Sequence, residues 1–274
     1  MRSIISHGHI FKNAGSTLDW SLARNLGANF LDHRDDKGIR TDTLATLQSL
    51  LSKTPNLKAI SSHHLPQPLP AIDGITFHYV YLLRHPLARI LSVYHFEHKQ
   101  DSDSLGAKAA KNLSLREYVM WRMQPDVPAT IRNYQTRYLA GFHVRSPHLE
   151  ITPQAFGEAI THLRKGAVVG IVENYDESMV VIEDYFRRQS IELDLSYVRQ
   201  NTGSSYASGN AAARTAALAN ELDQETLDCV LRENSLDLAL YYEAKTKLSE
   251  CCNKIDNFSG KLLDFRARCR ALNE

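Results

Sequence analysis

Two short segments place basic and hydroxyl side chains directly after apolar segments. Residues 11–17 read FKNAGST, so Lys12 is followed by small residues and then by the hydroxyls of Ser16 and Thr17. Residues 82–96 read LLRHPLARILSVYHF, which carries Arg84 and, eight residues later, Ser92. Basic side chains, hydroxyls and free backbone amides are the groups with which proteins bind phosphate. The chemistry that these segments predict is anion binding at two places.

The first segment has the composition of an anion nest at the start of a helix. Small residues let backbone amides turn inward, here those of Asn13, Ala14, Gly15, Ser16 and Thr17. Lys12 adds a mobile positive charge. The ATP-binding pattern GxxxxGK[ST] is absent, because the lysine precedes the glycine. An ordinary turn with a solvated lysine is the alternative interpretation.

The second segment suits another phosphate. A buried strand that ends in Arg84 and leads into a helix carrying Ser92 offers a guanidinium and a hydroxyl to the same anion. Arg89 faces either this site or solvent. The alternative for Arg84 is a structural pair with a carboxylate. Two anion sites on neighbouring strand ends predict a nucleotide with two separated phosphates.

Alternating strands and helices must position these residues. Apolar runs at 2–11, 57–62, 75–84 and 167–175 predict strands, and helical periodicity predicts helices at 16–27, 41–53 and 86–99. This alternation predicts an α/β fold with a doubly wound parallel sheet. Ligands bind at the carboxyl ends of such strands. The polar residues expected along that edge are Lys12, His63, His64, Arg84 and Glu173.

The remaining regions and the composition limit the class of protein. Two regions, at about 100–150 and 209–274, are predicted to be mainly helical, and the longest periodic run covers 223–248. All 274 residues are expected to form one domain. Lys plus Arg is 32 and Asp plus Glu is 31, so a nucleic-acid partner is not expected. No window approaches the roughly 20 apolar residues of a membrane span, and no signal peptide is recognisable. A cytoplasmic protein is therefore expected, while its oligomeric state is not predicted.

The two anion segments resemble those of sulfotransferases that use 3′-phosphoadenosine 5′-phosphosulfate (PAPS). FKNAGST is similar to their 5′-phosphosulfate loop, and LLRHPLARILSVYHF to their 3′-phosphate motif. Residues 133–141, 169–178 and 233–248 are similar to segments, in the same order, of carbohydrate sulfotransferases related to the heparan sulfate 2-O and 6-O enzymes. His85 replaces the usual Asp, Phe11 a common Pro, and Ala14 a frequent Gly. We interpret the change in the loop as mild, because alanine permits most backbone geometries, although not a strained positive φ. His85 bears on how the strand end is braced and leaves Arg84 and Ser92 in place.

This resemblance implies transfer of a sulfuryl group from PAPS to a hydroxyl of a carbohydrate, on a polysaccharide or a glycolipid. It implies a P-loop-like domain whose helical insertion at about 100–150 lies on the acceptor side. Lys12 would assist the leaving group, while Arg84 and Ser92 would bind the 3′-phosphate of PAPS and of its product, adenosine 3′,5′-bisphosphate (PAP). No metal is expected. The segment NTGSS resembles the late loop that closes over the nucleotide, which adds the contacts Asn201, Thr202 and Ser204.

An acceptor hydroxyl needs a general base, and two histidines follow the second predicted strand. Histidine titrates near neutrality, and neighbouring residues that leave a strand point in opposite directions, so one of the two faces the site. His64 is favoured over His63, because His64-Leu65-Pro66 aligns better with the Gly-His-Phe-Pro segment of related enzymes. Two surface histidines are the alternative. Arg132, Gln135 and Arg137 are predicted to contact an anionic sugar.

Two other functions compete with this hypothesis. One is a P-loop-like kinase that uses ATP, which the position of Lys12 and the site at Arg84 oppose. The other is a binding module that keeps the nucleotide pocket without the chemistry, for which His85 is the only indication. His95 and His98 have a spacing that permits a metal pair, but no third ligand is obvious, so a solvated helix face is favoured.

Overall fold

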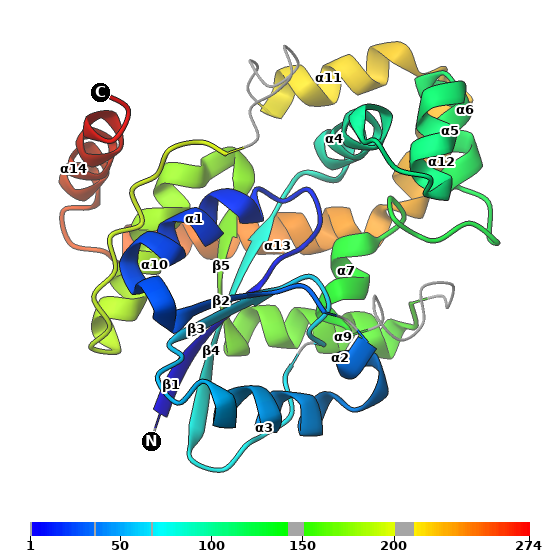
Figure 1. Ribbon diagram of the computed structural model, residues 1–274. Helices are drawn as coiled ribbons and strands as arrows, with labels where there is room; N and C mark the ends of the chain where they lie inside the picture. The colour runs from blue at the N-terminus through cyan, green and yellow to red at the C-terminus, as the bar shows by residue number, and fades with distance from the viewer. Residues whose placement is uncertain (1, 36, 67, 142–150, 201–210) are drawn as a thin grey trace.

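The computed structural model describes residues 2–35, 37–66, 68–141, 151–200 and 211–274 (Figure 1). In these ranges the strands are β1 (Arg2–Gly8), β2 (Phe30–His33), β3 (Ala59–Ser62), β4 (Ile75–Leu83) and β5 (Ala167–Ile171). The helices of the first half are α1 (Gly15–Leu26), α2 (Lys37–Thr41), α3 (Thr43–Lys53), α4 (Pro86–Lys99), α5 (Leu105–Asn112), α6 (Leu115–Arg122) and α7 (Tyr134–Leu139). Those of the second half are α9 (Pro153–Thr161), α10 (Tyr175–Arg188), α11 (Ala211–Glu221), α12 (Gln224–Glu233), α13 (Ser235–Asn253) and α14 (Phe258–Ala271).

The five strands form one parallel sheet in the order β2-β3-β1-β4-β5. Gly8 at the end of β1 lies opposite Ser62 of β3 and Tyr81 of β4, and Leu83 lies opposite Ile171 of β5. All the segments that follow these strands therefore leave the sheet at the same edge. The expected α/β architecture with a parallel sheet is confirmed, and this edge is where the polar residues gather.

Helices cover both faces of the sheet, because successive strand side chains point to opposite sides. On β1, Ile5 packs in one core cluster with Leu18 and Leu22 of α1. Its neighbour Ile4 packs in another with Leu47 of α3. Figure 1 shows α1 and α10 on one side of the sheet and α3 on the other.

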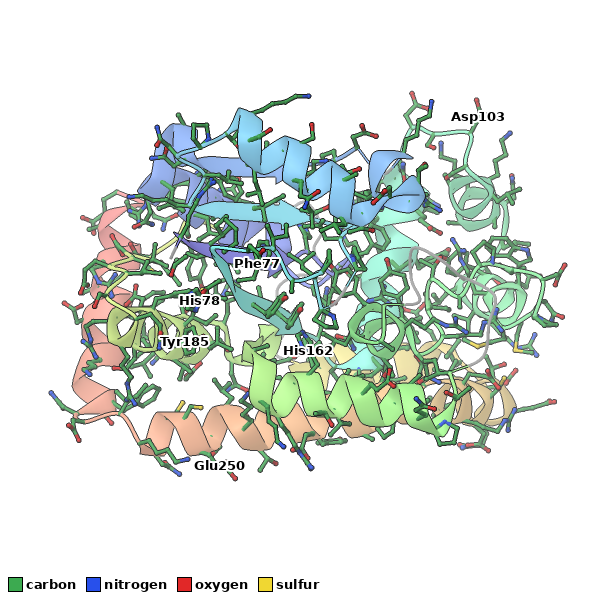
Figure 2. All side chains as sticks on the ribbon, turned by 90° about the horizontal axis from the view of Figure 1, so that it is seen from below. Phe77, His78, Asp103, His162, Tyr185 and Glu250 are labelled. Atoms are coloured by element: carbon green, nitrogen blue, oxygen red, sulfur yellow. The ribbon has the colours of Figure 1, made fainter. Side chains whose placement is uncertain are left out.

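The packing of α10 on β4 is visible at the far end of the sheet from the polar edge. Figure 2 shows His78 of β4 beside Tyr185 of α10, and their Nδ1 and hydroxyl oxygen lie 3.2 Å apart. The neighbouring Phe186 is fully buried in the same core cluster. The helix that follows β5 is thus fixed against the adjacent strand.

Three elements differ from the sequence prediction. The strand β2 was not predicted, because it is a four-residue edge strand without clear alternation. Within the region predicted to be mainly helical at about 100–150, helix α7 begins only at Tyr134, after Asn133, whose φ of 43° is left-handed. The run expected over 223–248 divides at Asn234, which is buried and accepts a hydrogen bond from the backbone of Asn133 at 3.1 Å. Contacts across more than 100 residues decided the last two boundaries.

The described parts of the two predicted helical regions are indeed mainly helical, from α5 to α7 and from α11 to α14. Residues 142–150 of the first region and 209–210 of the second lie outside the described ranges. Among the helices of the described ranges, none combines the length and apolar character needed to cross a membrane.

Candidate anion-binding site

Two arginines hold the loop after β1, one directly after β4 and one on α4. Arg84 Nη1 donates to the carbonyl oxygen of Lys12 at 3.1 Å, and Arg89 Nε donates to that of Phe11 at 3.0 Å. In a trans peptide the carbonyl and the following N–H point in opposite directions. Tying back the carbonyl of Phe11 therefore turns the N–H of Lys12 away from Arg89. The two arginines therefore hold the loop in its conformation and also place positive charge beside it.

Several backbone amides of this loop have no protein acceptor. No side chain caps α1, and among the described residues nothing accepts the N–H groups of Lys12, Ala14, Gly15 or Ser16. Helix starts with unsatisfied amides are binding places for anions. The set of backbone amides available to bind an anion is therefore smaller than the sequence predicted. The amide of Asn13 bonds to Ile10, and that of Thr17 to Ala14, so these two are occupied.

The backbone of the loop is more strained than the sequence indicated. Ala14, the residue before α1, has φ 59° and ψ 19°, and Lys12 has φ 65°. A left-handed conformation costs a non-glycine residue about 1–2 kcal/mol. The interpretation of Ala14 as a mild replacement for glycine is therefore wrong, since this position uses the geometry that glycine adopts freely.

Lys12 is a partly buried cation among other cations. Its Nζ lies 4.4 Å from the centre of the Phe96 ring, and no carboxylate of the described residues pairs with it. Burial, and then the charges of Arg84 and Arg89, lower the pKa of Lys12 to about 8. A charge in such a place is costly unless an anion compensates it. The three cations form the positive centre of the site.

The sequence left open whether Arg89 faces the anion site or solvent, and in the structure it does neither. It is only 2% exposed and faces neither solvent nor an open site. Its Nη1 donates to the carbonyl of Thr130 at 2.8 Å, and its guanidinium lies 4.3 Å from the ring of Tyr134. The Nη2 atom is buried and has no hydrogen-bond partner among the described residues. Arg89 is therefore a buried support of the loop whose charge still acts on Lys12.

The other predicted nucleotide contacts have different outcomes. Ser92 is half-buried on α4, in the second turn after the proline. Thr17 is buried, and its hydroxyl accepts from the backbone of Gln200 at 3.3 Å. The predicted contacts of the late loop lie outside the described residues: Asn201, Thr202 and Ser204.

Gln135 is not an acceptor contact, and this prediction is wrong. It is completely buried, and its Oε1 accepts from Asn13 Nδ2 at 2.7 Å and from the backbone of Arg84 at 2.9 Å. Asn13 also donates to the carbonyl of Leu82 at 2.7 Å. Both amide side chains are therefore internal supports that connect the loop with the end of β4.

The two arginines predicted on the acceptor side also face inward or onto their own loop. Arg132 Nη2 donates to the carbonyl of Val127 at 2.6 Å, and Arg137 is only 7% exposed on α7. Neither residue lines the cleft described below. That these two arginines contact an anionic sugar stays a prediction.

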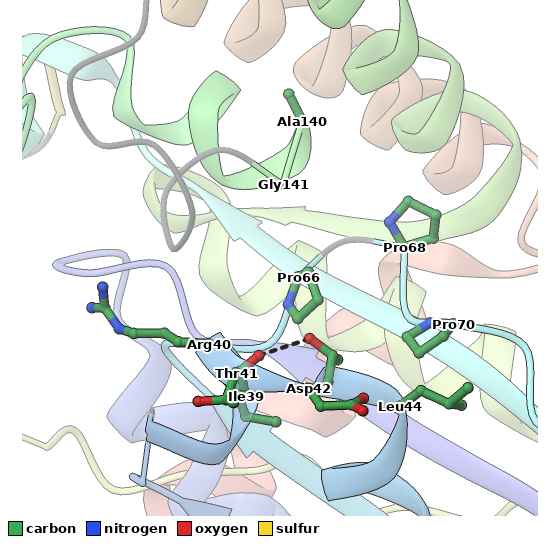
Figure 3. Close-up of a pocket in the computed structure, with 11 residues that line it drawn as sticks. Ile39, Arg40, Thr41, Asp42, Leu44, Pro66, Pro68, Pro70, Ala140 and Gly141 are labelled. Atoms are coloured by element: carbon green, nitrogen blue, oxygen red, sulfur yellow. Dashed lines mark hydrogen bonds between the residues drawn. The ribbon is translucent and has the colours of Figure 1, made fainter.

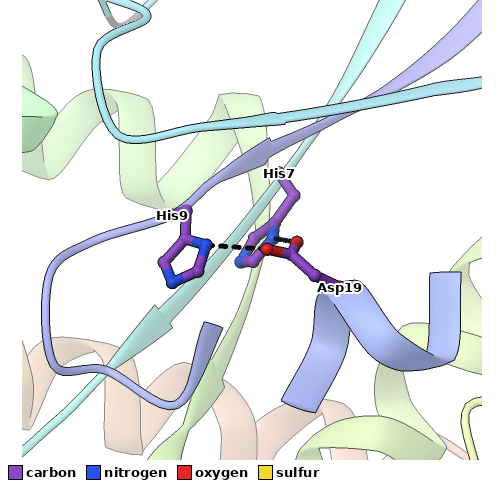
Figure 4. Close-up of side chains that lie close together, drawn as sticks. All are labelled: His7, His9 and Asp19. Atoms are coloured by element: carbon purple, nitrogen blue, oxygen red, sulfur yellow. Dashed lines mark hydrogen bonds and ion pairs between the residues drawn. The ribbon is translucent and has the colours of Figure 1, made fainter. Parts of the chain in front are cut away.

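A buried cluster of His7, His9 and Asp19 lies beneath the loop, and the sequence analysis missed it (Figure 4). Each oxygen of Asp19 contacts one histidine Nδ1 at 2.7 Å. Burial alone would raise the pKa of Asp19, but the two histidines hold it well below its usual range. Burial lowers the pKa of His9. The spacing of two residues between the histidines, at the end of a strand, was the available signal.

The cluster fits a hydrogen-bonded support better than a metal centre. A metal on Nδ1 would place the proton of His7 on Nε2, and metal-bound histidines donate that N–H to an acceptor. Within the part of the chain that the structure describes, the buried His7 Nε2 has no hydrogen-bond partner. A neutral imidazole that donates from Nδ1 to Asp19 leaves no buried donor unsatisfied. Asp19 of α1 thus fixes both imidazoles below the start of its own helix.

His9 explains why the first residue of α1 is glycine. A Cβ at Gly15 would lie 2.3 Å from Cδ2 of His9, whose ring Asp19 locks. Gly15→Ala should therefore lower the free energy of unfolding by about 1–3 kcal/mol. Urea unfolding of the variant measures this change.

Gly157 of α9 provides the matched control, because nothing lies within 4 Å of a Cβ built there. Alanine at this exposed helical position should raise the free energy of unfolding by about 0.5–1 kcal/mol. Equal effects of the two substitutions would contradict the contact between Gly15 and His9.

The two candidate bases have different surroundings. His63 Nδ1 donates to the carbonyl of His9 at 2.5 Å, and the two rings lie 4.1 Å apart. Burial, and then the neighbouring charges of His9 and Arg34, lower the pKa of His63 to about 3. The ring of His64 lies 6.2 Å from that of His63 and is partly exposed. His63 is a supporting residue, and His64 is the better placed of the two to meet a substrate.

The strand end at His85 is braced from β5. The backbone amide of His85 donates to both carboxylate oxygens of Glu173, at 3.2 and 3.3 Å. The His85 ring lies edge-on to Tyr241 at 5.2 Å, and burial lowers its pKa. Glu173, expected at this edge, is thus a structural carboxylate for the segment that carries Arg84.

A cleft is lined partly by the segment that follows His64 in the chain, although neither His63 nor His64 lines it (Figure 3). Its volume is about 570 Å³, within the usual range of ligand sites. Pro66, Pro68 and Pro70 of the segment after His64 form one wall. The other walls come from α2 and α3 and from the end of α7, and their lining residues are Ile39, Arg40, Thr41, Asp42, Thr43, Leu44, Ala140 and Gly141.

Comparison with known proteins gives a relative but no activity. No protein-family model matches the chain. A protein of Archaeoglobus fulgidus, described only as uncharacterized, is 27% identical over 245 residues, which cover 88% of this chain and 95% of the archaeal one. The similarity thus extends over most of the length of both chains.

Proposed function

We propose that this chain transfers a sulfuryl group from PAPS to a hydroxyl of a carbohydrate, on a polysaccharide or a glycolipid. The observation that carries the proposal is the pair of Lys12 and Arg84 at the ends of adjacent parallel strands, joined by the bond from Arg84 to the Lys12 carbonyl. A donor with two separate phosphates offers one anion to each residue. The unsatisfied amides at the start of α1 suit the 5′-phosphate.

The topology supports a P-loop-like arrangement as part of this proposal. The loop that carries Lys12 follows β1, the central strand of the order β2-β3-β1-β4-β5, and leads directly into a helix. Its lysine stands before the glycine rather than after it, which separates it from the usual ATP loop. Arg84 and Ser92 on the next strand and helix add the groups for a 3′-phosphate, which ATP lacks.

In the proposed reaction the acceptor oxygen attacks sulfur while the bond between sulfur and the bridging oxygen breaks. Lys12 stabilises the negative charge that develops on that oxygen. His64 accepts the proton of the acceptor hydroxyl, because His63 is bonded to the carbonyl of His9 and has a low pKa. The proposed place of the acceptor is the cleft whose wall includes Pro66, two residues after His64 in the chain.

Calorimetric titration of PAP, without metal, tests the nucleotide class. Wild type should bind PAP, and Arg84→Ala should weaken binding about 10- to 100-fold, the usual effect of removing hydrogen bonds to a charged group. Arg164→Ala is the control, because Arg164 pairs with Glu243 at the opposite edge of the sheet. Its affinity should equal that of wild type.

Three other results would redirect the proposal. Absence of PAP binding by wild type would refute it. Preference for ATP with Mg²⁺ over PAP would favour the kinase. Binding of PAP without consumption of PAPS, over a panel of unsulfated polysaccharides and glycolipids, would favour a module that binds the nucleotide without chemistry.

A further inference from the structure

One buried side chain joins the two anion-binding segments. Gln135 Oε1 accepts from Asn13 of the loop and from the backbone N–H of Arg84, and Gln135 Nε2 donates to the carbonyl of Arg84 at 2.9 Å. The side chain therefore pairs with both backbone groups of Arg84 while it also holds the loop. These contacts span 122 residues of sequence on one side and 51 on the other.

Gln135 is itself fixed by the C-terminal helices. Its backbone N–H donates to Asp237 Oδ2 at 3.1 Å, and that of Thr136 donates to Asp237 Oδ1 at 2.7 Å. The N–H of Asp237 donates in turn to Asn133 Oδ1 at 3.0 Å. Asp237 and Asn234 are each only 1% exposed. The start of α7 is thus anchored on α13 by hydrogen bonds that do not involve the Lys12 loop.

We infer that Gln135 is a positioning residue that fixes the separation between the Lys12 loop and the Arg84 strand end. An amide side chain can accept from two N–H groups with its oxygen and donate to a carbonyl with its nitrogen at the same place, as Gln135 does here. Since a bisphosphate must meet both segments at once, a fixed separation lowers the cost of binding it. A ligand with one phosphate gains little from that separation. The ligand part of this inference rests on the proposed function, and the geometric part does not.

The first test compares ligands with one and two phosphates. Gln135→Met, which keeps the length of the side chain but not its hydrogen bonds, should weaken PAP binding about tenfold or more, because preorganisation is lost. The affinity of the same variant for adenosine 5′-monophosphate and for adenosine 3′-monophosphate should fall less than about threefold, because one phosphate does not need the fixed separation. The control is Gln154→Met, because the side-chain amide of the exposed Gln154 donates to Glu158 on α9 and to no other described residue. Calorimetry gives all the affinities.

The second test needs no nucleotide. Lys12 has a pKa of about 8 through burial and through Arg84 and Arg89. If Gln135→Met lets the loop move away from the strand end, this pKa should rise toward that of an ordinary lysine. NMR of the ¹³C-dimethylated lysines, followed over pH, reports it. Circular dichroism checks that the variant is folded, and Gln135→Glu, which keeps the acceptor but loses the donor, replaces it if it is not.

The outcomes separate this inference from the proposed function. An unchanged Lys12 pKa in the variant overturns the inference whatever the ligands do. Equal loss for the bisphosphate and both monophosphates also overturns it, because a general loss of structure explains that result. If wild type binds no PAP, the proposed function fails, and the Lys12 pKa alone then decides whether Gln135 sets the separation.

Discussion

Lys12→Met should lower the rate of sulfuryl transfer about 10²- to 10³-fold, the usual effect of removing a group that stabilises developing charge. The variant should fold at least as stably as wild type. Burial already disfavours the charge of Lys12, and methionine packs against Phe96 without that cost. Transfer of ³⁵S from labelled PAPS to the best acceptor of the panel measures the rate, and urea unfolding measures the stability.

The pH profile gives this prediction a second readout. With a pKa of about 8 in the free protein, Lys12 loses its proton above pH 8, so kcat/KM should fall up to about tenfold per pH unit there. Lys12→Arg keeps the charge over this range and should remove the alkaline fall. Lys58→Met is the matched control, because Lys58 is exposed just before β3 at the opposite edge of the sheet.

A flat wild-type profile between pH 7 and 9 would show that the protonated lysine is not needed. A normal rate for Lys12→Met would remove Lys12 from the chemistry altogether. Loss of stability together with loss of rate would instead assign the lysine to the support of the loop.

His64→Ala should lower kcat about 10²- to 10⁴-fold, the range for loss of a positioned general base. Binding of PAP should remain within about twofold of wild type, because the base contacts the acceptor and not the nucleotide. The same ³⁵S transfer assay gives kcat, and calorimetry gives the affinity for PAP.

Two other histidines provide the comparison. His63→Ala removes the ring packed on His9 and should lower stability more than His64→Ala does. His98→Ala, on the exposed face of α4, should change neither rate nor stability. A near-normal kcat for His64→Ala would refute its role as base, and a large loss for His63→Ala without loss of stability would transfer the role to His63.

The order and type of the main elements could be predicted because their signals are local. The apolar runs before Lys12 and before Arg84 correspond to β1 and β4, and Pro86 begins α4 as expected. Strand β2 could not be predicted in this way, because its few residues become a strand only by pairing with β3.

The candidate site was predicted less completely than the elements that carry it. Lys12, Arg84 and the amides at the start of α1 lie after β1 and β4, as the predicted boundaries between strand, loop and helix indicated. Gln135 was assigned to the wrong face, because the polarity of a side chain does not tell whether its partners are substrate or protein. Its partners, Asn13 and Arg84, are distant in sequence.

The sequence by itself determined which groups follow each strand, since alternation, glycine and proline act over a few residues. The tertiary structure alone decided what those groups do. Pairing of β1 with β4 brings Arg84 and Arg89 to the Lys12 loop and lowers the pKa of that lysine. The packing of His9 against Gly15 leaves no room for a Cβ at the first residue of α1. These effects depend on burial and on contacts between distant segments, which exist only once the chain is folded.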